Sequence, residues 1–83
     1  MKLGNYYENV NCESFIDKET GRARIRTIPC EAIPKPILVE SLKKFRADYP
    51  IGTKFTTKNV KICKKPDGRI YARAEKQMLY VIE

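Results

Sequence analysis

The chain has 83 residues, 42% hydrophobic and 33% charged, and its lysines and arginines outnumber its acids 17 to 10, giving a net charge of +7. At this length folding removes only about 60% of the unfolded chain's surface from water, so we expect one small domain over residues 1–83. The longest apolar run, Met78 to Ile82, is far shorter than the roughly 20 residues that span a bilayer. We therefore expect no membrane-spanning segment.

The cysteine and histidine content argues against an enzyme or a metalloprotein. Three cysteines, Cys12, Cys30 and Cys63, leave one unpaired in any disulfide scheme, and none lies in a CxxC motif, so a reducing cytoplasm is the expected location. The chain has no histidine, which removes the commonest general base and the commonest zinc ligand. We expect no catalytic residue, no metal and no cofactor, and we place Cys12 in the core.

The first part of the chain predicts two strands joined by a hairpin. Residues Tyr6 to Ile16 alternate imperfectly and are followed by the polar stretch 17–21, which ends in glycine. Residues 22–28 alternate with period two, so one strand face carries Ala23, Ile25 and Thr27 and the other carries Arg22, Arg24 and Arg26. The three arginines repel one another unless an anionic group faces them, and Glu13 on the preceding strand could be that group.

The middle of the chain predicts a loop and then a helix. Prolines at 29, 34 and 36 prevent regular strand pairing, so residues 29–35 should form a loop. A helix can begin at Pro36, because Leu38, Leu42 and Phe45 follow at helical spacing. The segment Tyr49–Gly52 should end it.

The last part predicts three strands. Phe55 differs in parity from Val60 and Ile62, so the strand over residues 53–62 either has a bulge near residues 57–59 or is apolar on both faces. The turn sequence Lys65-Pro66-Asp67-Gly68-Arg69 should close a hairpin. The returning strand over residues 70–74 is followed by a break at residues 75–77 and a final strand over residues 78–82.

The predicted fold class is α+β, with the order ββαβββ and one helix packed on a curled antiparallel sheet. The final strand is apolar on both faces, although one helix covers only one face of a sheet. Either the sheet curls into an SH3-like or OB-like partial barrel, or a second subunit covers the other face.

The basic residues of the predicted hairpin suggest a non-enzymatic module that contacts nucleic-acid phosphates. From Lys54 onward eight basic residues face three acids, and the residues that gather near the hairpin tip or on its outer face are Lys61, Lys64, Lys65, Arg69, Tyr71 and Arg73. Cations could follow a phosphate backbone while the tyrosine stacks on a base. The alternative is that lysines on an exposed strand only prevent aggregation.

A second hypothesis is a protein-interaction role without nucleic acid. The segment Tyr49–Phe55, followed by Pro66–Tyr71, resembles in general style small proteins of phages and mobile elements, a resemblance that carries no functional residues. It would imply an accessory protein of such an element. We expect such a protein to form a homodimer through the doubly apolar segment Met78, Leu79, Tyr80, Val81 and Ile82.

Overall fold

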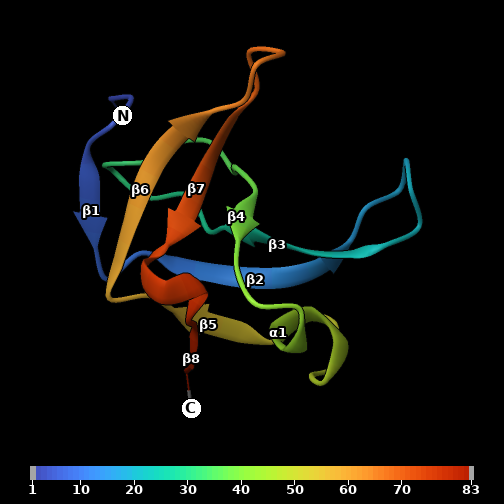
Figure 1. Cartoon of the computed structure of the whole chain (residues 1–83). Helices are drawn as coiled ribbons and strands as arrows, with labels where there is room; N and C mark the ends of the chain where they lie inside the picture. Colours follow the sequence, from blue (N-terminus) through green and yellow to red (C-terminus); the bar gives the residue numbers. More distant parts are fainter. Residues whose placement is uncertain (1, 83) are drawn as a thin grey trace.

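The structure is a computed structural model that describes residues 2–82, and it folds into two small sheets with one short helix (Figure 1). The elements in chain order are β1 (Tyr6–Glu8), β2 (Asn11–Ile16), β3 (Ala23–Thr27), β4 (Val39–Glu40), α1 (Lys44–Ala47), β5 (Lys54–Thr56), β6 (Asn59–Lys64), β7 (Ile70–Ala74), the 3-10 turn η1 (Glu75–Gln77) and β8 (Tyr80–Val81).

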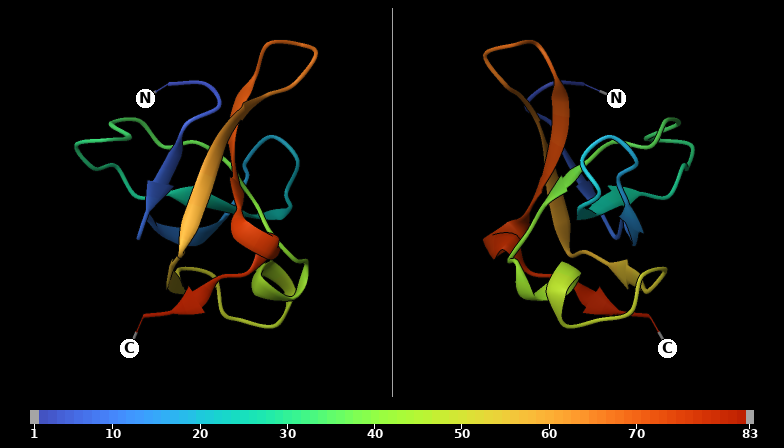
Figure 2. Two further views of the ribbon diagram at one scale, coloured as in Figure 1. Left: turned by 60° about the vertical axis from the view of Figure 1, so that its left-hand side comes forward. Right: turned by 90° about the vertical axis from the view of Figure 1, so that its right-hand side faces the viewer.

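The strands form two four-stranded sheets. One has the order β1-β6-β7-β4 and the other the order β3-β2-β5-β8. All neighbouring strands are antiparallel except β4 and β7, which run parallel. The two views in Figure 2 show the sheets crossing rather than lying in one plane.

Two bent stretches of chain, β1–β2 and β5–β6, each contribute a strand to both sheets. β1 pairs with β6 in the first sheet, and their continuations β2 and β5 pair in the second. At the corner Asn9 has a φ of +53°, and the backbone N–H of Thr57 donates to the carbonyl of Val10 at 3.1 Å. In place of the bulge expected near residues 57–59, the chain breaks there into β5 and β6. The single strand predicted over residues 6–16 is wrong because the chain bends at Asn9 and Val10.

Hydrogen bonds also link β4 back to β3, at the opposite side of the molecule. Arg26 and Leu38 form an isolated antiparallel bridge. The N–H of Thr27 donates to the carbonyl of Ile37 at 2.8 Å, and the N–H of Ile37 donates to the Thr27 hydroxyl at 3.0 Å. Backbone pairing therefore runs from β3 to β2. It continues through the pairs β2–β5 and β1–β6 to β7 and β4, and it returns from β4 to β3.

The core lies between the two sheets. Phe55 is fully buried and contacts the buried ring of Phe45 edge-on, with their centroids 5.8 Å apart. Cys12 is also fully buried, as predicted, and burial raises the pKa of its thiol to about 12. The other buried apolar residues are Val10, Ile25, Ile33, Val39, Val60, Ile62, Ala72, Ala74 and Leu79.

The predicted helix is largely wrong, because the first eight residues assigned to it are not helical. Residues 39–40 form β4, and the helix itself covers only Lys44–Ala47. The N–H of Ala72 donates to the carbonyl of Leu38 at 2.8 Å, so β7 recruits this segment as a strand. Leu42, assigned to the apolar helix face, is 40% exposed. Pairing with a distant strand overrides the helical spacing of the apolar residues here. The predicted order ββαβββ therefore lacks the strand β4.

The predicted C-terminal hairpin is confirmed. Gly68 has a φ of +95°, which glycine adopts without strain, and its N–H donates to the carbonyl of Lys65 at 2.8 Å. The final strand is shorter than predicted: β8 covers only Tyr80–Val81, and Leu79 just before it is buried. Within residues 2–82, the structure contains no helix long and apolar enough to cross a membrane.

Candidate functional site

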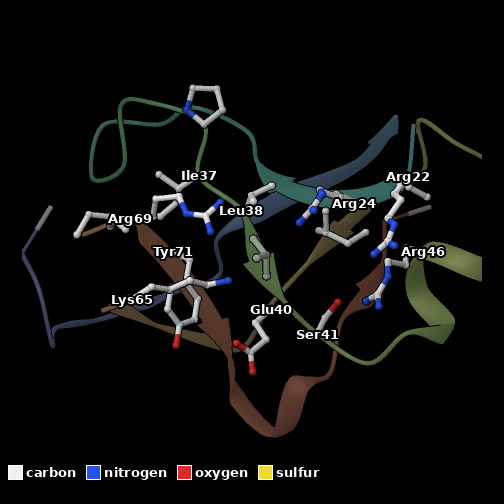
Figure 3. Close-up of a pocket in the computed structure, with 15 residues that line it drawn as sticks. Arg22, Arg24, Ile37, Leu38, Glu40, Ser41, Arg46, Lys65, Arg69 and Tyr71 are labelled. Carbon is white, nitrogen blue, oxygen red and sulfur yellow. The ribbon is translucent and has the colours of Figure 1, made fainter. Parts of the chain in front are cut away.

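A groove of about 520 Å³ lies over β3, β4 and β7. This volume is within the range of about 300–1,000 Å³ that is typical of small-ligand sites. Figure 3 shows its side chains converging from three strands, the β6–β7 turn and α1. The polar and aromatic side chains that line it are Arg22, Arg24, Glu40, Ser41, Arg46, Lys65, Arg69 and Tyr71.

One end of the groove is formed by the tip of the β6–β7 hairpin. The ammonium group of Lys65 lies over the Tyr71 ring, 5.4 Å from its centroid. Arg69 at the turn donates from Nε to Asp67 Oδ2 at 2.8 Å, and the Arg69 backbone N–H holds the pKa of Asp67 below its ordinary value. Desolvation is the main cause that raises the pKa of Tyr71 above its ordinary value. This end offers a half-buried aromatic ring beside a cation.

The other end of the groove is formed by Arg22 and Arg46, which come close together because α1 lies against β3. Arg22 immediately precedes β3, Arg46 lies on α1, and Figure 3 shows their guanidinium groups on the same side of the groove. Neither forms an ion pair with a carboxylate of residues 2–82, whereas Arg24 Nε lies 3.0 Å from Asp17 Oδ2. This end therefore carries two uncompensated positive charges.

Ser41 lies on the groove wall between these two ends. The residue is 7% exposed, and its hydroxyl has no hydrogen-bond partner among residues 2–82. Buried hydroxyls are usually paired, because leaving one unpaired costs about 1–3 kcal/mol. The neighbouring Glu40 is the only carboxylate among the groove residues described here, and its Oε1 lies 3.9 Å from Arg73 Nε.

Only half of the predicted site residues line the groove. Lys65, Arg69 and Tyr71 line the groove, but Lys61, Lys64 and Arg73 do not. Lys61 lies on the far strand of the hairpin, with its Nζ 5.8 Å from the ring centroid of Tyr6. Lys61 and Arg73 are cross-strand partners on the hairpin, so they lie beside the groove and not in its lining.

A separate cluster neutralises the other end of the arginine ladder. Glu13 accepts a hydrogen bond from Arg26 Nε at 2.9 Å and another from the ammonium of Lys54. Both hydrogen bonds hold the pKa of Glu13 below its ordinary value, and the bond from Lys54 has the larger effect. The pairing of Glu13 with the arginine strand expected from the sequence is confirmed for Arg26.

Sequence reasoning missed two groove residues and undervalued a third. Arg46 and Ser41 were not predicted as site residues, because the helix expected from the sequence did not show what their side chains face. Arg22 was recognised in the alternation of residues 22–28, but only as part of an ion-pair ladder. Its separation from Arg46 by 24 positions hides their proximity until β3 and α1 are placed together.

Side chains able to hold a metal do not gather in residues 2–82: no group of three or more histidines, cysteines or acids forms there. Comparison with protein-family models, with curated proteins and with solved structures gives no match for this chain.

Proposed function

We propose that this chain is a non-enzymatic module that binds single-stranded nucleic acid in the groove over β3, β4 and β7. The observation that carries the proposal is the lining of the groove. Five basic side chains line it together with one aromatic ring, Tyr71, and one carboxylate, Glu40; the basic residues are Arg22, Arg24, Arg46, Lys65 and Arg69. Cationic grooves that follow a phosphate backbone, combined with aromatic platforms for bases, are typical of proteins that bind single strands.

The strand order supports an OB-like interpretation of the fold. With β1–β2 and β5–β6 each counted as one bent strand, five strands pair in a ring, and α1 lies between the third and the fourth. OB-folds are partly open five-stranded barrels that bind oligonucleotides over strands two and three, between the loops that follow strands one and four. In this chain those strands are β3 and β4, and the loops are residues 17–22 and 65–69.

The proposed contacts follow from the two ends of the groove. A base stacks on Tyr71, and phosphates on either side pair with Lys65 and with the uncompensated Arg22 and Arg46. A duplex keeps its bases stacked internally and cannot present one to Tyr71. We therefore expect preference for single strands over duplexes.

The proposal is tested by fluorescence anisotropy with labelled single strands of about 12 nucleotides and the matching duplex, across a salt series. If about four phosphates of a single strand are neutralised, affinity should fall roughly 50-fold between about 50 and 200 mM salt. Absence of binding at low salt, or binding indifferent to salt, would reject the proposal.

The exposed edge strand β8 favours a second candidate function, self-association. Tyr80, Val81 and Ile82 are each 40–42% exposed, and within residues 2–82 the strand β8 pairs only with β5. Unpaired edges with apolar side chains promote pairing with another chain. Sedimentation equilibrium should then show a dimer that Val81→Lys converts to a monomer, whereas a monomer at high micromolar concentration would exclude this candidate.

A further inference from the structure

We propose that the arginine end of the groove is a subsite for a single phosphate group, formed by Arg22, Arg46 and the Ser41 hydroxyl. The inference rests on the proposed function in that a strand would supply this phosphate. It also predicts that inorganic phosphate, which carries no base, binds to the subsite.

Ser41 is the independent observation behind this subsite. The residue is more than nine-tenths buried and lines the groove, and its hydroxyl oxygen, which has almost no accessible surface, has no hydrogen-bond partner within residues 2–82. Rotation about the Cα–Cβ bond would turn this hydroxyl toward a bound phosphate. A hydroxyl can donate to a phosphate oxygen, and a phosphate oxygen is the partner that the neighbouring arginines would attract. In the view of Figure 3 the Ser41 side chain lies between those of Glu40 and Arg46.

The charges around the subsite favour an anion. Arg22 and Arg46 come from different elements and lack acidic partners in the described chain, and guanidinium groups match phosphate oxygens with paired hydrogen bonds. Asp17 already faces Arg24 at 3.0 Å, so that pair contributes little net charge. Glu40, which opposes an anion, is half-exposed and lies next to Arg73 at 3.9 Å.

Titration of the ¹⁵N-labelled chain with inorganic phosphate at low chloride concentration tests the subsite. We expect saturable shifts of the amide signals of residues 22, 41 and 46, with millimolar affinity. Ser41→Ala should weaken phosphate binding about 5-fold and Arg46→Gln about 10-fold. Lys61→Gln removes one positive charge outside the groove and should leave binding within 2-fold of the unmodified chain.

The same variants separate this inference from the proposed function. Ser41→Ala should melt at the same temperature as the unmodified chain or higher, since the hydroxyl holds no partner that the variant would lose. If oligonucleotides bind but phosphate shifts none of the three signals, the subsite is rejected and the proposed function stands. The same conclusion follows if Ser41→Ala binds oligonucleotides and phosphate as tightly as the unmodified chain. If phosphate binds at these residues but no oligonucleotide binds, the subsite stands and the proposed function fails.

Discussion

The two ends of the arginine ladder on β3 differ in what faces them. At one end Arg26 donates to Glu13, which also accepts from Lys54, so the charges are largely compensated. At the other end Arg22 faces a groove together with Arg46, and no carboxylate of residues 2–82 pairs with either. The two ends share a strand and a residue type.

This difference shows that the number of basic residues does not identify a binding surface. A net charge of +7 creates a field that attracts polyanions everywhere on the molecule. A compensated arginine already has its hydrogen-bond acceptor, whereas an uncompensated one is available to a ligand. We therefore expect binding at the groove and structural stabilisation at the Glu13 cluster.

The largest expected effect comes from removing two cations at each end in turn. The variants Arg22→Gln with Arg46→Gln, and Arg26→Gln with Lys54→Gln, each lower the net charge from +7 by two, to +5. The groove variant should lose about 2 kcal/mol of binding free energy for a single strand, or roughly 30-fold in affinity. The cluster variant should change affinity less than 3-fold. Equal losses in anisotropy titrations would show that charge number alone governs binding.

Two tyrosines that each lie beside a lysine give a matched test of the aromatic contact. Lys65 lies over Tyr71 in the groove, and Lys61 lies over Tyr6 on the edge strand β1. Tyr71→Ala should weaken single-strand binding about 10-fold, the scale of one base stacked on an aromatic ring, while Tyr71→Phe retains most affinity. Tyr6→Ala should have no measurable effect. Comparable losses for Tyr6→Ala and Tyr71→Ala would place the strand elsewhere.

Glu13→Gln should act on stability rather than binding. Its partly exposed ion pairs should together contribute about 1 kcal/mol to the free energy of unfolding. Because the pKa of Glu13 is lowered on folding from an ordinary value of 4.5, this stabilisation is present above that pH and is lost as pH falls through the folded pKa. In urea unfolding at pH 7, the variant should have a lower free energy of unfolding than the unmodified chain. This difference should disappear at a pH below the folded pKa of Glu13. A deficit independent of pH would contradict the ion-pair origin.

The smallest expected effect concerns the carboxylate in the groove. Glu40 opposes a phosphate, and Glu40→Gln also releases Arg73 from its weak pairing at 3.9 Å. Single-strand affinity should increase about 3-fold at low salt, and the gain should shrink as salt screens the charges. Weaker binding by Glu40→Gln would mean that the carboxylate accepts a hydrogen bond from the ligand.

The parts of the fold that were predictable from sequence are those fixed by local chemistry. Pro66, Asp67 and Gly68 determine a turn by themselves, and the alternation of residues 22–28 places the arginines on one face of β3. The parity change after Phe55 indicated the corner between β5 and β6. In each case neighbouring residues carry the whole signal.

The helix and the groove were not predictable in this way, because both depend on distant pairing. The apolar residues at 38, 42 and 45 suit a helix, yet β7 and β3 provide hydrogen-bond partners for residues 37–40 and convert them to a strand. That strand carries Ser41 to the groove wall, and the shortened helix places Arg46 beside Arg22. An incorrect helix therefore concealed the part of the site with the strongest structural support.

The most direct test of binding in the groove is to map the amide signals of the ¹⁵N-labelled chain as a single-stranded oligonucleotide is added. The account predicts shifts concentrated at residues 22–24, 37–41, 46 and 65–71, with little change at residues 6–8, 13, 54 and 80–82. Shifts centred on β1 and the outer part of β6, or spread evenly over the basic surface, would contradict it.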